Sequence, residues 1–429
     1  MKPPASAGQA GSLEESPKRI SGGGTQHLSQ GGLALKDRTS AGGLPAAARS
    51  WFDRGVSYLS IPRLGEVPGR AIGVDALRGF AILLVVLGHS ISNAENLLVA
   101  SRYNLEYYLS NFIYTFHMPL FFLVSGYVLF GKKIKIQDRA LRLLVPFLAW
   151  IPVYWFVNRY FLHFPWPVLF WPTLKDTLLH PAVGLWFLPV LFLCSLLLIP
   201  TSALEKRWSW TGEASLLAIF VIINFIPVDI VGVMQVKYFF FFFAAGYLLA
   251  KHRKRIQRIG ENRINVALAG LSILFLALFV TLYQLKSIKP FDFPVVLANL
   301  FKAPGPYLIR YSMAFLGIAF AVAIVKATRS TRARAVLAWF GLVTMDIYVA
   351  HGLMMQLAFG SGWTKLVLSF VFGIVLSLVL SFFLLRQWWL TAAVFLGIKR
   401  KKPTGALELP GEMRDAFDDQ QVETPIPEP

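Results

Sequence analysis

Cysteine and charge are what this chain of 429 residues has least of. Its one cysteine, Cys194, lies inside an apolar run, which excludes a disulfide framework and a cysteine-based metal site. Charged residues make up only 15% of the chain, whereas hydrophobic residues make up 55%. That balance excludes an ordinary soluble domain and is typical of a polytopic membrane protein, so we expect the lipid bilayer to be a partner.

Acidic residues are also scarce, which leaves a net charge of +19. Such a charge is compatible with nucleic-acid binding, but the lysines and arginines cluster in short loops between apolar runs. This clustering is the orientation signal of cytoplasmic membrane loops, and we therefore expect no nucleic-acid partner. The first apolar run starts after about seventy residues, so we also expect no signal peptide.

Composition divides the chain into three parts. Residues 1–70 are rich in glycine, serine, alanine and proline and predict a disordered cytoplasmic tail. Within them, residues 49–59 are either a plain linker or a short amphipathic helix on the membrane surface. Residues 71–390 form the predicted membrane domain, and the predicted cytoplasmic C-terminal tail, 391–429, is proline-rich and acidic after its first basic residues.

Ten apolar runs predict an all-α, polytopic membrane fold. They cover residues 72–91, 112–130, 143–161, 184–203, 214–231, 236–250, 264–285, 309–326, 337–358 and 364–386. The fifth and sixth are short and close together, so they are two spans, a broken pair or a re-entrant element. Basic residues concentrate after the second, sixth and eighth runs, at 132–142, 251–263 and 326–335, and again in the tail at 399–402. This alternation predicts a multi-pass protein of the inner or plasma membrane with both termini in the cytoplasm.

The first run carries charged and polar residues that a membrane helix tolerates only at a cost. Arg78 and His89 are eleven positions apart, so at about 100° per residue both side chains lie on one stripe of a helix. An ionisable residue inside a membrane is by default a candidate for function. The alternative is that Asp75 and Arg78 form an i,i+3 pair at the membrane boundary and that His89 is a satisfied polar residue.

Other polar residues complete a gradient along the predicted bilayer normal. Arg139 and Arg142 form an R-x-x-R pair at the cytoplasmic start of the third run, and arginine suits phosphate because its planar fork donates two hydrogen bonds. His89, His117 and His351 fall at outer depth, and neutral histidine suits general-base catalysis. Each has a plain alternative, namely a topology signal for the arginines and local packing for His117. The histidines lack metal-ligand spacing, so we expect no metal site.

These segments resemble the acyltransferase-3 family of integral membrane proteins, which transfer acyl groups, usually acetyl, to sugars and other envelope molecules. Three motifs carry most of the match: R-x10-H from Arg78 to His89, FHMPLFFLVSGYVLF with Ser125 and Tyr127, and DRALRLLVP. Three later segments follow in the family's order, namely LWFLPVLF, FFFAAGYLL and IYVAH. It covers residues 72–390, and its style is closest to sugar O-acetylases of the fucose 4-O-acetylase-like branch. The resemblance implies ten spans around a central cavity.

The resemblance also implies a reaction, with acyl-CoA as the donor, no permanently bound cofactor, and an extracytoplasmic acceptor hydroxyl on a sugar or an exported glycan. We expect acetyl-CoA to dock with Arg139 and Arg142 on phosphate and Arg78 guiding the pantetheine or a phosphate. His89 then acts as general base, although an acyl-His89 intermediate is also open. The remaining candidates for binding donor or acceptor are Asp75, Ser125, Tyr127, Trp186, Tyr348 and His351. Tyr348 and His351 position the acceptor or stabilise the oxyanion, whereas Trp186 and Tyr127 either line the cavity or only pack.

Two other classes stay open from the residues alone. A transporter of an anionic or lipid-linked substrate would also have many spans and intramembrane histidine and arginine. Against it, no inverted repeat is recognisable and the polar residues are asymmetric in depth. A sensor or scaffold without turnover is the third class. The sequence does not define an oligomeric state.

Overall fold

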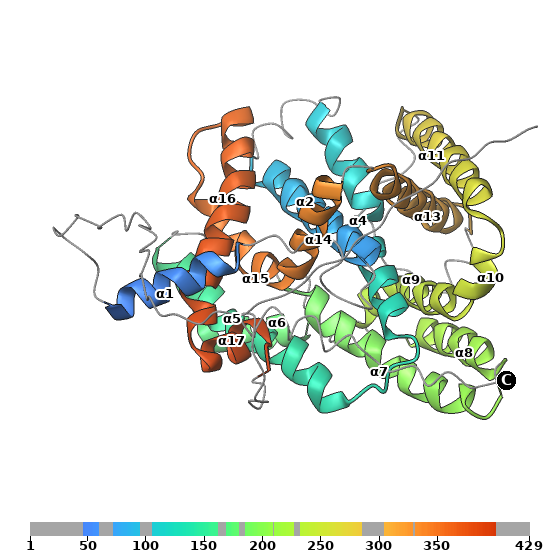
Figure 1. Cartoon of the computed structure of the whole chain (residues 1–429), viewed down its shortest axis with the longest axis horizontal. Coiled ribbons are helices and arrows are strands. Elements are labelled where there is room, and N and C mark those ends of the chain that lie inside the picture. Colours follow the sequence, from blue (N-terminus) through green and yellow to red (C-terminus); the bar gives the residue numbers. More distant parts are fainter. Residues whose placement is uncertain are drawn as a thin grey trace, which may run out of the picture. The chain divides into compact units, whose positions relative to one another are not determined.

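The computed structural model describes residues 46–59, 72–94, 105–161, 169–179, 185–208, 210–226, 232–284, 304–328 and 331–399. Over these residues all regular secondary structure is helical, which confirms the all-α prediction (Figure 1). The tails predicted to be disordered lie mostly outside the described residues.

Eight of the described helices are long and apolar enough to cross a bilayer. They are α2 (Ile72–Asn93), α4 (Leu105–Leu129), α5 (Ile136–Tyr160), α7 (Phe187–Glu205), α9 (Val233–Lys251), α11 (Glu261–Gln284), α13 (Pro304–Ala327) and α16 (Gly362–Phe383). Each coincides with a predicted apolar run. The protein is therefore an all-α, multi-pass membrane protein.

The predicted fifth and ninth spans differ from expectation. α8 (Thr211–Phe225) has 15 residues, too few for a bilayer core of about 30 Å. The predicted continuous span 337–358 is wrong, because α14 (Thr331–Leu342) and α15 (Thr344–Met354) meet at a bend of 73°. The Thr344 hydroxyl donates to the carbonyl oxygens of Phe340 and Gly341 at 3.1 and 2.9 Å and so satisfies backbone groups at the bend. Counted as one broken span, the pair brings the described total to nine.

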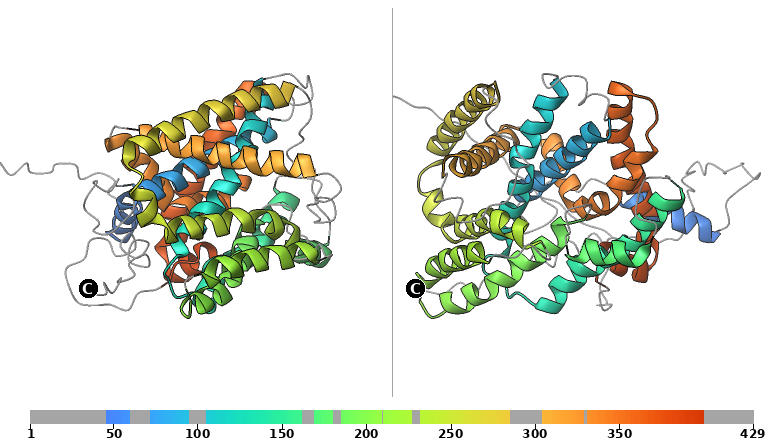
Figure 2. Two further views of the ribbon diagram at one scale, coloured as in Figure 1. Left: turned by 90° about the vertical axis from the view of Figure 1, so that its right-hand side faces the viewer. Right: turned by 180° about the vertical axis from the view of Figure 1, so that it is seen from behind.

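Shorter elements join or flank these helices. They are α1 (Ala46–Ser57), α6 (Phe170–Leu179), α10 (Arg253–Gln257), η1 (Met355–Leu357), η2 (Leu385–Gln387) and α17 (Trp389–Leu396). α6 lies in the connection between the third and fourth predicted spans, where the ring of Phe170 packs 5.3 Å from that of Trp155 on α5. α11 and α13 run side by side at one edge of the bundle (Figure 2).

Glycines allow two helix pairs to touch backbone to backbone. A Cβ added at Gly79 of α2 would lie 1.8 Å from the Leu337 carbonyl oxygen on α14, and one added at Gly341 would lie 2.0 Å from the Asp75 carbonyl oxygen. α4 and α9 repeat this arrangement, since Cβ atoms at Gly126 and Gly246 would each lie 1.9 Å from a carbonyl oxygen of the other helix. In lipid, where apolar burial gives helices little reason to associate, such close approach is a main source of packing energy.

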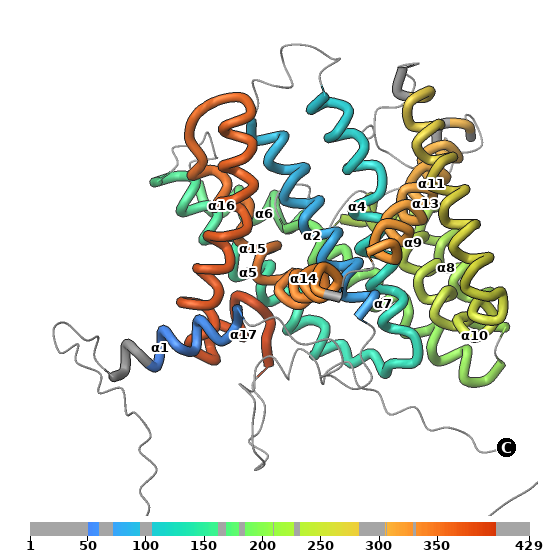
Figure 3. Tube along the Cα trace, turned by 45° about the horizontal axis from the view of Figure 1, so that its top comes forward, coloured from blue at the N-terminus to red at the C-terminus, as the bar shows by residue number. Residues whose placement is uncertain are grey.

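Helix α1 (Ala46–Ser57) is fastened to the bundle at one end of α16 (Figure 3). The rings of Trp51 and Phe52 pack 5.5 and 5.6 Å from Phe383, and the Trp339 indole donates to the Tyr58 carbonyl oxygen at 3.2 Å. Of the two alternatives for residues 49–59, the structure has the helix.

Candidate active site

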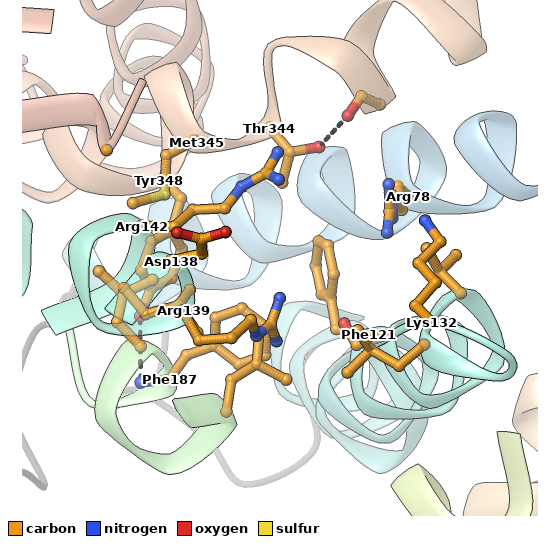
Figure 4. Close-up of a pocket in the computed structure, with 18 of the residues that line it drawn as sticks. Arg78, Phe121, Lys132, Asp138, Arg139, Arg142, Phe187, Thr344, Met345 and Tyr348 are labelled. Carbon is orange, nitrogen blue, oxygen red and sulfur yellow. Dashed lines mark hydrogen bonds between the residues drawn. The ribbon is translucent and has the colours of Figure 1, made fainter. Parts of the chain in front are cut away.

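A cavity of about 290 Å³ opens among α2, α4, α5, α7 and the α14–α15 bend. Its walls are strongly cationic, and the nitrogen-bearing ends of Arg78, Lys132, Arg139 and Arg142 lie around the same space (Figure 4). The basic residues of the lining are Arg78, Lys132, Lys133, Lys135, Arg139, Arg142 and Lys399, against the single acid Asp138. A recess with this charge attracts an anionic ligand, and its arginines can donate paired hydrogen bonds to phosphate.

Arg139 is held inside this cavity by one end of its guanidinium. Its Nη2 donates to the Ser195 hydroxyl on α7 at 2.6 Å, and that hydroxyl donates onward to the Leu191 carbonyl oxygen at 2.7 Å. The Nε–H of Arg139 has no hydrogen-bond partner among the described residues. A buried donor without a partner is costly unless a ligand or water takes its hydrogen.

The edge of the cavity near Arg142 depends on a glycine. Gly397 follows α17 with φ of +68°, and a Cβ there would lie 2.6 Å from the Arg142 carbonyl oxygen. Only glycine meets both conditions without strain. Two residues later, Lys399 forms an ion pair with Asp138 across the same edge. The chain after α17 therefore contributes to the wall.

Asp75 serves the site through Arg78. Its Oδ1 lies 3.6 Å from Arg78 Nη1, and its side chain is 3% exposed, whereas that of Arg78 is 20% exposed. Asp75 does not line the cavity. The predicted i,i+3 pair is thus present, and it points the guanidinium of Arg78 toward the ligand space.

The bend between α14 and α15 places a helix N-terminus at the cavity wall, because Thr344 and Met345 are lining residues. Backbone N–H groups at such an end favour anions. Asp346, in the first turn, would oppose this, but its carboxylate accepts from Arg386 Nε at 2.7 Å and Nη2 at 2.9 Å, and also from the Ser381 hydroxyl. All three side chains are buried, so the pair fixes α15 to the end of α16.

Aromatic rings form an apolar part of the cavity wall, called the aromatic end below. The ring of Phe187 packs 5.6 Å from Phe121 and 5.5 Å from Tyr348, and the Phe187 backbone N–H donates to the Tyr348 hydroxyl at 3.3 Å. All three residues line the cavity. This apolar end suits the uncharged part of a ligand whose anionic part lies among the basic residues.

Two imidazoles lie one helical turn beyond the cavity lining. Val85 and Tyr348 line the cavity, and His89 and His351 follow them by four and three residues. The two imidazole rings are 5.4 Å apart, and the Tyr114 hydroxyl of α4 lies 3.4 Å from His89 Nδ1. His351 is buried, whereas the His89 side chain stays accessible between its two neighbours.

The hydrogen bonds of His351 define its neutral tautomer. Nδ1 lies 2.7 Å from the Tyr348 carbonyl oxygen and 3.2 Å from that of Ile347. A carbonyl oxygen can only accept, so Nδ1 of the neutral ring carries the hydrogen and Nε2 carries the lone pair. His117 makes the same kind of bond to the Ile113 carbonyl oxygen at 2.7 Å, but it does not line the cavity.

The structure gathers half of the sequence-predicted site residues at the cavity: Arg78, Ser125, Arg139, Arg142 and Tyr348. His89 and His351 lie next to each other beyond it, and Asp75 lies behind Arg78. Trp186 and Tyr127 are outside the lining. Trp186 stacks 5.2 Å from Phe239 and 6.5 Å from Phe122, which agrees with the packing alternative.

Several cavity residues were not predicted as ligand contacts. Lys132, Lys133 and Lys135 belong to a basic run that the sequence identifies only as a topology signal. The number of lysines in this run was the one feature that could have indicated anion binding. Lys399, Ser195 and Phe187 reach the site only through the tertiary fold. Among the described residues, no group of three or more histidine, cysteine, aspartate or glutamate side chains is placed to hold a metal ion.

Apolar helices around a cavity lined by basic residues define a polytopic membrane protein with a cationic cavity inside its helical bundle. Comparison with known proteins gives its family. The model of the acyltransferase domain matches residues 72–386, well over half of the chain, so the chain belongs to the acyltransferase-3 family.

Two curated relatives carry the name nodulation protein NolL. Over 192 residues the chain is 28% identical to that of Mesorhizobium japonicum and 30% identical to that of Sinorhizobium fredii. Each match covers 42% of this chain and about half of the relative, 48% and 49% respectively. No solved structure matches the chain significantly.

Proposed function

We propose that this protein is a membrane-embedded O-acyltransferase that moves an acyl group, acetyl in the first instance, from cytoplasmic acyl-CoA to a hydroxyl of a sugar or exported glycan. The observation that carries the proposal is the cationic cavity that ends one helical turn from two imidazoles. Family membership supports acyl transfer as the reaction class.

The cavity fits the chemistry of a coenzyme A thioester. Such a donor has phosphate groups at its nucleotide end and a long, uncharged arm that ends in the thioester. Arg139 and Arg142 would bind phosphate, and Arg78 a phosphate or the arm, while the aromatic end would receive the arm. In this arrangement the thioester points toward His89 and His351. The acyl-CoA is a co-substrate, and no resident cofactor is invoked.

The imidazole pair supplies what the reaction needs at the far end. A hydroxyl must lose its proton as it attacks the thioester carbonyl, and base catalysis of that step is typically worth about 10² to 10⁴-fold. The sequence predicts His89 as this base. The acceptor class, a carbohydrate hydroxyl on the outer side of a cell membrane, follows from the resemblance to sugar O-acetylases. It assumes that the basic connections and both termini face the cytoplasm.

The test uses purified protein in vesicles with acetyl-CoA labelled on the acetyl group and a panel of oligosaccharide acceptors. We expect release of CoA that depends on acceptor, with label recovered on oxygen of the sugar. His89→Ala should abolish this transfer while the protein remains inserted and abundant. Movement of substrate across the vesicle membrane without transfer of label would instead support the transporter class. Absence of both transfer and movement would also contradict the proposal.

A further inference from the structure

We propose that His351 is the general base that removes the proton of the acceptor hydroxyl, and that His89 beside it holds the acyl donor in place. This inference rests on the proposed acyl transfer and divides the work between the two imidazoles. The general base is thereby His351 on α15, and no longer His89, which the sequence favours.

The first argument is the tautomer of His351. Both carbonyl oxygens near Nδ1 are acceptors, so the neutral ring keeps its hydrogen there. Nε2 therefore carries the lone pair and, among the described residues, has no hydrogen-bond partner. In serine hydrolases a carboxylate orients the catalytic histidine in the same sense, with Nδ1 as donor and Nε2 as base.

The second argument is that His89 lacks this preparation. Its one described hydrogen-bond contact is the Tyr114 hydroxyl, 3.4 Å from Nδ1. A hydroxyl can donate or accept, so this contact leaves either neutral tautomer of His89 available. A base whose lone pair is already in place loses no free energy in adopting the reactive form, and His351 is the imidazole that meets this condition.

The third argument is that the helix carrying His351 is anchored. Arg386 holds the carboxylate of Asp346 with two hydrogen bonds, and Asp346 lies five residues before His351 on α15. Tyr348, between them, is both a lining residue of the cavity and the acceptor of the Phe187 backbone hydrogen bond. His351 is thus set at a fixed height above the aromatic end, next to the ring of His89.

The step balances without another reactant. The acceptor O–H proton passes to His351 Nε2 while the oxygen bonds to the thioester carbonyl carbon. The C–S bond then breaks and CoA leaves as a thiolate. The thiolate takes the proton from the His351 imidazolium, which restores the neutral base. His89, 5.4 Å away, contacts the acyl group and does not lose or gain a proton overall.

The decisive variant is His351→Asn, because the asparagine amide can keep the Nδ1 hydrogen bond to the backbone while the base is absent. We expect kcat for a sugar acceptor to fall about 10² to 10⁴-fold with the KM for acetyl-CoA nearly unchanged. The acidic limb of the pH–kcat profile should disappear. Transfer to hydroxylamine, a nucleophile that needs no base, should persist above the enzyme-free rate.

His117→Asn is the matched control, because it removes an imidazole that makes the same kind of backbone bond but packs its ring against Tyr114 at 4.9 Å. We expect its sugar acetylation to stay within about threefold of the parent. Equal losses in both variants, or loss of hydroxylamine transfer in His351→Asn, would show a packing role and overturn the inference. If both the parent and His351→Asn acetylate the sugar, only the assignment of His351 as general base is overturned. If the parent itself is inactive, the proposed function is overturned.

Discussion

At the scale of single residues, the proposed donor site contains one guanidinium group, that of Arg139, which the fold leaves partly unsatisfied. Arg139 has one nitrogen tied to Ser195 and another, Nε, without a described partner, inside a cavity with one acidic side chain. The hydrogen bond to Ser195 offsets part of its desolvation, and an anion in the cavity would offset more. We therefore assign Arg139 to ligand binding, beyond the topology signal that any basic residue at this boundary provides.

Arg139→Gln should raise the KM for acetyl-CoA about 10 to 100-fold, because hydrogen bonds to a charged group contribute about 1.5–3 kcal/mol. The kcat at saturating donor should change little, since the reacting end of the thioester lies elsewhere. Initial-rate kinetics over a range of donor concentrations measures both values. Arg159→Gln is the control, because Arg159 is on the same helix and does not line the cavity. An unchanged donor KM in Arg139→Gln would remove this residue from the donor site.

Sequence reasoning was most informative for residues that a short motif ties together. R-x10-H and R-x-x-R placed Arg78, Arg139 and Arg142 at the site because helical periodicity fixes their direction. It was less informative where the role of a residue depends on hydrogen bonds that only the folded structure defines. The tautomer of His351 depends on the turn of α15 that carries it, and Ser195 reaches Arg139 only because α5 and α7 pack together.

At the scale of helices, the architecture depends on close backbone crossings. α4 and α9 touch at Gly126 and Gly246, and α4 also contributes Phe121 and Ser125 to the cavity. Any side chain at Gly126 must push the two helices apart and move those lining residues. The position of α4 in the site is thus set by a contact on the opposite side of the helix.

Gly126→Ala should destabilise the protein by about 1–3 kcal/mol, the usual cost of overpacking. We expect a lower melting temperature in detergent and a smaller monodisperse fraction in size-exclusion chromatography. Gly270→Ala on α11 serves as the comparison, since nothing lies within 4 Å of a Cβ there and alanine favours helix. If both variants matched the parent, the crossing would not contribute to stability.

The helices themselves were largely readable from apolar runs, but the bend between α14 and α15 was not. Hydropathy continues through residues 337–358 without a proline, so the run predicts one straight span. The break arises from the hydroxyl of Thr344 bonding its own preceding turn and from the pull of Arg386 on Asp346. Both effects require partners that periodicity cannot identify.

At the scale of the whole molecule, the N-terminal part of the chain is not uniform. α1 belongs with the membrane helices, whereas residues 1–45 lie outside the described residues. The ring of Tyr58 lies 5.1 Å from the Arg386 guanidinium, so it covers the buried ion pair that anchors α15. Composition alone merged these two parts into one predicted tail, because a short helix with few apolar residues resembles a linker.

Removing residues 1–45 should leave acyl transfer within about twofold of the parent, because this truncation keeps α1 and its contacts with the bundle. Removing residues 1–59 should reduce the amount of folded protein several-fold, because the contacts to Phe383, Trp339 and Arg386 are lost together. Fluorescence-detected size-exclusion chromatography and acetyl transfer per folded molecule measure the two effects. Equal behaviour of the two truncations would contradict a bracing role for α1.

The close contact of the glycines on α2 and α14 has a consequence for how the proposed donor would reach the imidazoles. With Gly79 and Gly341 each seated on the other helix's backbone, those two rods cannot slide or separate without breaking contact. We therefore expect Arg78 and the start of α15 to keep fixed positions relative to each other. If a donor's arm is to extend from the cavity toward the imidazoles, we expect the adjustment at the start of α7, where Phe187 contacts Tyr348 through a ring contact and a hydrogen bond. We therefore expect the start of α7 to adjust when a ligand is bound, while the α2–α14 pair stays fixed.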